Sequence, residues 1–165
     1  MTSQSFQSNS TRRVWLLGML ALGTTSIAVA AKPPAIPVEV WKDPNCGCCG
    51  DWVKHLEANG LRVKVHDTGN TAMRARLGVA TKYGSCHTGF VGGYAIEGHV
   101  PAREILRLLK EKPAAIGLAV PGMPVGSPSM EVDGQTPEEY HIWTYDDAET
   151  KQLVVRALGT RFRPA

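Results

Sequence analysis

The sequence has little net charge and no stretch in which basic residues gather. Its 165 residues include 18 lysines and arginines and 15 acidic residues, a formal net charge of +3 at pH 7. Proteins that bind nucleic acid usually carry lysine and arginine clustered on one face or along one helix. Because this chain has no such cluster, we expect no nucleic-acid partner.

The sequence also lacks internal repeats, and only one apolar run approaches the length of a membrane span. That run, residues 14–23, follows Arg12-Arg13 and leads into small residues that end in Ala28-Val29-Ala30. The three parts have the form of an export signal with its cleavage site. A membrane anchor is the alternative, but the run is short for a spanning helix.

We therefore expect residues 1–30 to be a cleaved export signal peptide. Residues 11–16, Thr-Arg-Arg-Val-Trp-Leu, resemble a twin-arginine signal, and the general secretory (Sec) route stays open. Cleavage removes two arginines and no acid, so the formal net charge falls to +1. The mature chain would have no membrane segment, and its length suits one domain.

The sequence has only four cysteines, but three of them fall within four positions: Cys46, Cys48 and Cys49. Alternating residues 38–41 predict a strand before them, and the helical spacing of residues 51–59 predicts a helix after them. A helix N-terminus favours thiolates, which bind metals and attack disulfides. The alternative, a structural disulfide with a spare thiol, leaves the third cysteine without a role.

The remaining patterns predict the element order β-α-β-α-β-β-α, which is the order of a thioredoxin-like α/β domain with a mixed central sheet flanked by helices. We place this domain at residues 38–158, after a flexible lead-in at 31–37 and before a C-terminal tail at 159–165. The expected elements are strands at 38–42 and 61–66, helices at about 49–59, 70–77 (capped by Asn70) and 101–112, a hairpin at 89–96, and closing strands at 138–145 and 152–156.

Cys86 and His87 lie in the predicted loop before the hairpin. In thioredoxin-like domains this loop faces the N-terminus of the first helix, so the fourth cysteine would lie opposite the other three. A surface histidine is the alternative for His87, but its position beside a cysteine favours a metal ligand. We interpret His141 as a structural or surface residue and His55 as a solvated one.

Residues 121–130, Pro-Gly-Met-Pro-Val-Gly-Ser-Pro-Ser-Met, form a loop rich in proline, glycine and methionine, which excludes a helix or a central strand. A thioether is a soft ligand that suits Cu(I), whereas methionine that fills a gap in the core is the alternative. Met123 is our first choice as a further ligand. Whether Met130, His99 or His141 also binds metal stays open.

Four motifs together resemble the CopG-like periplasmic copper-resistance proteins: DPNCGCCG at 43–50, CHT at 86–88, YAIEGHVP at 94–101 and GLAVPGMP at 117–124. The resemblance covers residues 36–156 and implies a thioredoxin-like fold in the periplasm. It also implies copper bound by the cysteine cluster and a role in copper resistance through interconversion of Cu(I) and Cu(II), the chemistry of a copper oxidoreductase. A periplasmic electron donor or a copper efflux protein would then be a partner.

The donor atoms point to the same metal, because thiolate, thioether and imidazole together select Cu(I), with a Cys₃His zinc site as the competing interpretation. Neighbouring cysteines diverge at the start of a helix, so one tetrahedral ion cannot easily bind all four thiolates. We therefore expect a thiolate-bridged cluster of more than one copper ion per chain. Without metal, Cys46 should pair with Cys49, or a disulfide should include Cys86. A thiol–disulfide oxidoreductase and a passive copper chaperone or store remain alternative functions.

Overall fold

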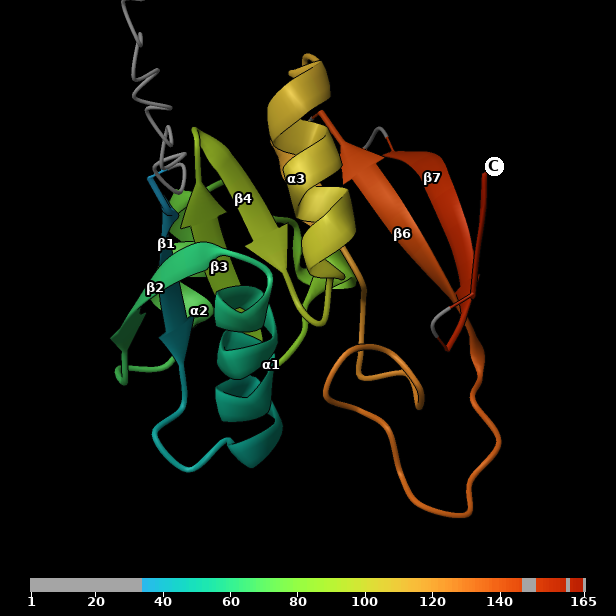
Figure 1. Cartoon of the computed structure of the whole chain (residues 1–165). Coiled ribbons are helices and arrows are strands. Elements are labelled where there is room, and N and C mark those ends of the chain that lie inside the picture. The colour runs from blue at the N-terminus through green and yellow to red at the C-terminus, as the bar shows by residue number, and fades with distance from the viewer. Residues whose placement is uncertain (1–33, 147–150, 160, 165) are drawn as a thin grey trace, which may run out of the picture. The chain divides into compact units, whose positions relative to one another are not determined.

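The computed structural model describes residues 34–146, 151–159 and 161–164; the predicted signal peptide lies outside these ranges. The described residues form a mixed α/β structure around one eight-stranded sheet, with strand order β2-β1-β3-β4-β5-β6-β7-β8 (Figure 1). The elements are β1 Ile36–Lys42, α1 Gly47–Ala58, β2 Leu61–His66, α2 Thr71–Arg76, a 3₁₀ turn at Thr81–Tyr83, β3 His87–Val91, β4 Tyr94–Glu97, α3 Ala102–Glu111, β5 Gly117–Ala119, β6 Glu139–Tyr145, β7 Lys151–Leu158 and β8 Arg161–Pro164. Among the described helices, none is long and apolar enough to cross a membrane.

The first three elements form a parallel β1-α1-β2 unit, as the sequence predicts. Ile36 pairs with Leu61 and Trp41 with His66, so β1 pairs with β2 along the whole length of β2. Helix α1 buries Trp52 and Leu56, which its 3.6-residue period places on one face. This unit places the N-terminus of α1 directly after the end of β1, which is where the three clustered cysteines occur.

The predicted hairpin is present as β3 and β4, antiparallel to each other, with β3 also antiparallel to β1. Gly92 and Gly93 form its two-residue turn, and both have positive φ values, 56° and 91°. That geometry suits glycine and matches the twist of a hairpin. Strand β3 begins at His87, two residues earlier than predicted, so Cys86 immediately precedes a strand of the sheet.

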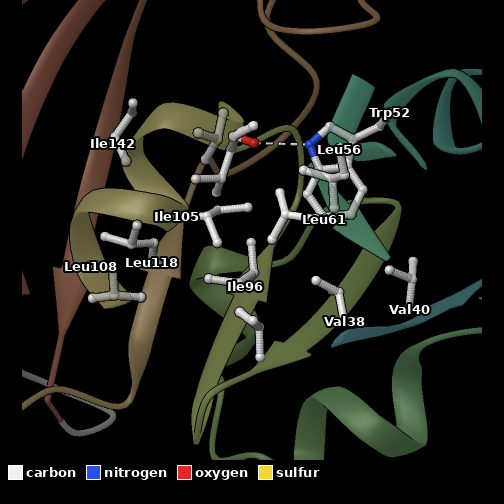
Figure 2. Packing of buried hydrophobic residues seen from close by; sticks show 14 of the residues in the cluster. Val38, Val40, Trp52, Leu56, Leu61, Ile96, Ile105, Leu108, Leu118 and Ile142 are labelled. Atoms are coloured by element: carbon white, nitrogen blue, oxygen red, sulfur yellow. Dashed lines mark hydrogen bonds between the residues drawn. The ribbon is translucent and has the colours of Figure 1, made fainter. Parts of the chain in front are cut away.

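Alternating residues of the central strands pack on the two faces of the sheet. Ile96 and Leu118 belong to the main core, which α1 and α3 cover (Figure 2). Ala95 and Ala119 belong to a smaller cluster with Tyr83 and other residues that follow α2. Helices therefore flank the sheet as predicted, and α3 turns Ile105 into the core while Leu106 is 36% exposed.

The C-terminal extension continues the same sheet and is larger than predicted. Strand β5 was not predicted, and it pairs with both β4 and β6. A side chain at Gly117 would overlap the carbonyl oxygen of Ala95, so this pairing requires glycine. Strand β8 lies within residues 159–165, the segment predicted to be a tail, and it pairs with β7. Residues 120–138 contain no helix or strand, as their proline and glycine content predicts.

Candidate metal centre

The three clustered cysteines lie at the N-terminus of α1. Cys46 is the N-cap residue, with extended backbone angles and a side chain that makes no capping hydrogen bond. Its own N–H donates to the carbonyl oxygen of Asp43 over 3.1 Å, and the Asp43 side chain accepts from the N–H of Asn45 over 2.8 Å. This turn leaves the sulfur atoms free of the helix cap, beside N–H groups that favour negative charge.

The fourth cysteine, Cys86, lies opposite the other three. The four sulfur atoms all fall within 4.8 Å of one another. Cys46 and Cys49 form a disulfide, one of the pairings the sequence predicts, while Cys48 and Cys86 are free thiols. The Cys48 sulfur is 3.6 Å from that of Cys46, and the Cys49 sulfur is 3.7 Å from the Cys86 carbonyl oxygen. Segments 37 residues apart therefore assemble one sulfur-rich site.

Two buried histidines lie beside Cys86. The Cys86 sulfur is 3.3 Å from Nδ1 of His87 and 3.1 Å from Nε2 of His99. His99 Nδ1 is 2.9 Å from the carbonyl oxygen of Pro128 and must donate to it, because a carbonyl only accepts. The proton of neutral His99 is therefore on Nδ1, and Nε2 presents a lone pair toward Cys86, an arrangement found in many histidine ligands of metals.

Burial keeps both imidazoles neutral. Desolvation is the main cause that lowers the pKa of His87 to about 3, and the positive charge that His99 would carry if protonated acts in the same direction. Desolvation also lowers the pKa of His99. Trp52 packs on His87 with ring centroids 4.2 Å apart. The indole N–H of Trp52 donates to the carbonyl oxygen of Val100 over 2.9 Å, the dashed line in Figure 2. Neutral imidazoles with fixed rings are ready to act as metal ligands.

The free thiol of Cys86 is protonated at neutral pH. Burial raises its pKa to about 11, and the negative charge that Cys48 would carry as a thiolate adds to the effect. A metal ion binds the thiolate form, so it would release this proton on binding. Affinity for metal at this cysteine is therefore coupled to pH.

Met123 lies next to the loop that carries Cys86. Gly122 donates its N–H to the Gly84 carbonyl over 3.2 Å and accepts a hydrogen bond from the Ser85 hydroxyl. These two bonds hold the methionine loop against the segment before Cys86. Met123 is 52% exposed and lines an open pocket of about 480 Å³ together with Cys86.

His141 does not belong to this centre. His141 is 3.6 Å from a carboxylate oxygen of Glu139 and contacts Trp143, and it belongs to neither of the metal-capable groups found among the described residues. Met130 is partly buried in the loop. The interpretation of His55 as solvated is wrong: its ring is half-buried and its Nε2 accepts the N–H of Ala102 over 3.1 Å at the start of α3.

His99 is the site residue that sequence reasoning left undecided, and the hairpin could have indicated it. Val91 and Tyr94 flank the two-residue turn, and counting outward along the register pairs Thr88 with Glu97. If the same register continues beyond the strands, His87 lies opposite Gly98 and Cys86 lies opposite His99. The Gly98 N–H indeed donates to the His87 carbonyl oxygen over 3.0 Å. A glycine pair at a turn thus predicts which residues meet beyond the strands.

Comparison with known proteins gives a consistent result. A family model described as a protein of unknown function, DUF411, matches residues 83–130. A solved structure titled copper resistance protein CopG, form 1, is 44% identical, covering 76% of this chain and 99% of its own, with a TM-score of 0.70. A second, titled form 2, is 43% identical, covering 74% of this chain and 98% of its own, with a TM-score of 0.69. No curated protein matches the chain.

Proposed function

The chain belongs to the family of the copper resistance protein CopG, and from this premise we propose that it binds copper through its cysteine cluster and contributes to copper resistance. The observation that carries the proposal is the convergence of four cysteine sulfur atoms and two buried neutral histidines within one site. Soft thiolate and imidazole ligands favour Cu(I) over hard cations.

The proposed ligands are Cys46, Cys48, Cys49, Cys86, His87 and Met123, to which the geometry adds His99. Cys86 belongs to two groups of candidate ligand atoms, one with the other cysteines and one with the two histidines. A sulfur shared by two groups suits a thiolate that bridges metal ions. We therefore propose more than one Cu(I) ion per chain. A zinc site of Cys₃His type would need only one such group.

Interconversion of Cu(I) and Cu(II) is the finer part of the proposal. The Cys46–Cys49 disulfide can accept two electrons, one from each of two Cu(I) ions, and gives two thiolates and two Cu(II) ions. The reverse transfer restores the disulfide. A periplasmic electron donor would be needed for turnover in the reducing direction, and a copper efflux protein would receive the product.

We also propose a thioredoxin-like fold and a periplasmic location. The strand order β2-β1-β3-β4, with β1 parallel to β2 and the cysteines at the start of α1, supports the first. The sequence of residues 1–30 supports export by the Sec or twin-arginine route. A disulfide at Cys46–Cys49 suits an oxidising compartment.

A thiol–disulfide oxidoreductase is the second candidate, because Cys46 and Cys49 form a disulfide with C-x-x-C spacing at a helix N-terminus. The copper-binding function and the oxidoreductase function can be tested by titrating fully reduced, metal-free protein with Cu(I) under anaerobic conditions. The titration is followed by the thiolate-to-copper absorption band. We expect an endpoint above one ion per chain, which Cys48→Ser lowers, and no displacement by equimolar Zn(II). Reduction of protein disulfides at a substantial rate, with no copper endpoint, would favour the oxidoreductase.

A further inference from the structure

We propose that Glu97, together with Arg74 and Thr88, acts as a clamp that positions Cys86 for copper. The hydrogen bonds of these three side chains go to the backbone of Ser85, to one another and to Asn70, so we assign them as positioning residues. The inference rests on the proposed copper function, because Cys86 is the one cysteine that both groups of ligand atoms share.

The carboxylate of Glu97 holds the chain on both sides of the Cys86-His87 dipeptide. It is completely buried at the end of β4. Its Oε1 accepts the N–H of Ser85 over 2.7 Å, and its Oε2 accepts the hydroxyl of Thr88 over 2.6 Å. One rigid group therefore fixes the residue before Cys86 and the residue after His87.

Two side chains from the α2 region complete the clamp. Arg74 donates from Nε to Glu97 Oε1 over 2.8 Å and from its terminal nitrogen to the Ser85 carbonyl. Asn70 donates from Nδ2 to the Ser85 carbonyl and to the Thr88 hydroxyl, each over 3.2 Å. Asn70 is the N-cap residue of α2, as predicted, but its side chain makes these bonds and no capping hydrogen bond. Both backbone polar groups of Ser85 are thus satisfied by side chains of the clamp.

Stability alone is a weak reason for this arrangement. The Glu97 carboxylate has no exposed surface and the Arg74 side chain is only 17% exposed, and apolar residues often stabilise such a position equally well. What the ion pair adds is a fixed direction for the Cys86 loop, with its sulfur 3.1 Å from His99. Arg74 also balances the charge of Glu97, so no net negative charge is placed next to thiolates that already repel each other.

The test compares Thr88→Val with Thr88→Ser. Valine keeps the shape of the buried side chain and removes the hydroxyl, whereas serine keeps the hydroxyl. Mutation of groups that orient metal ligands typically costs 10–100-fold in affinity. We expect Thr88→Val to weaken Cu(I) binding, measured by chelator competition, by about 10-fold, and Thr88→Ser to stay near wild type. In the copper-free protein, Thr88→Val should also speed alkylation of Cys86, measured by peptide mass analysis.

A double-mutant cycle with Cys86→Ser separates positioning from general destabilisation. If the clamp acts through Cys86, Thr88→Val has no further effect on copper once Cys86 is absent. Ile105→Val, a core change in α3, is the control for lost stability and should leave copper affinity and alkylation unchanged. Asn70→Ala is a milder variant, expected to act in the same direction, should Thr88→Val fail to fold.

The outcomes distinguish the clamp from the copper function. If the wild type binds copper, and Thr88→Val and Asn70→Ala match it in copper affinity and in the rate of Cys86 alkylation, the clamp is overturned and the copper function stands. Absence of copper binding by the wild type would overturn the function, while the alkylation rates of the copper-free variants would still decide whether the clamp holds Cys86.

Discussion

Acid should destabilise the copper-free protein, and His87 should account for much of the loss. Its pKa is about 3 in the folded protein, because burial opposes the charged form, against an ordinary value near 6.5. The unfolded chain therefore takes up the proton first as pH falls. The stability that neutral His87 contributes is present above about pH 6.5 and is lost as the pH falls from there toward 3.

The size of the effect follows from proton linkage. One pKa unit corresponds to 1.36 kcal/mol, so this histidine should remove about 2.5 kcal/mol of unfolding free energy between pH 7 and about pH 4.5. The lowered pKa values of His55 and His99 act in the same direction, and the raised pKa of the buried Glu97 carboxyl acts in the opposite one. A variant that lacks the His87 imidazole is therefore needed to isolate its share.

The share of His87 can be measured by urea unfolding of wild type and His87→Leu, followed by tryptophan fluorescence. The disulfide is kept intact and copper is removed by a chelator. Leucine is apolar, close to histidine in size and cannot be protonated. We expect the variant to lose about 2.5 kcal/mol less than wild type over this pH range. Equal losses in the two proteins would refute the reasoning, because they would mean that His87 is not held neutral by burial.

Other predictions concern the frame around the site. Gly98→Ala should destabilise the protein by about 1–3 kcal/mol in urea unfolding, since its φ is +73° and a side chain would collide with the Val120 carbonyl; an unchanged midpoint would contradict this. Trp52→Phe should cost about 1–3 kcal/mol of unfolding free energy by leaving the Val100 carbonyl unpaired, and a smaller loss would mean that water replaces the indole. Cys46→Ser should lower the unfolding free energy by about 2 kcal/mol through loss of the disulfide loop, with wild type under reducing conditions as the control. Copper-free protein isolated in air should have two free thiols by labelling and mass analysis; a count of four or none would show that the disulfide pattern is different.

Local patterns predicted most of the elements near the site, because those patterns have local physical causes. The alternation of β1, the helical spacing after Cys49 and the Gly92-Gly93 turn each depend on neighbours a few residues apart. Strand β5 was not predicted because its three residues are held by strands on either side, one of them far along the chain. The strand that ends the described chain, β8, was mistaken for a tail for the same reason.

For the candidate ligands too, some properties follow from the local sequence and others depend on distant contacts. The sequence by itself determined the chemistry: three cysteines at a helix start, a fourth beside a histidine, and the family resemblance that the solved CopG structures support. Tertiary structure decided which of these groups meet. Only the folded chain brings Cys86 to the other sulfur atoms, turns His99 toward it through the Pro128 carbonyl, and buries Glu97 behind the loop. Such contacts join residues far apart in the chain, and their geometry depends on packing that no local pattern encodes.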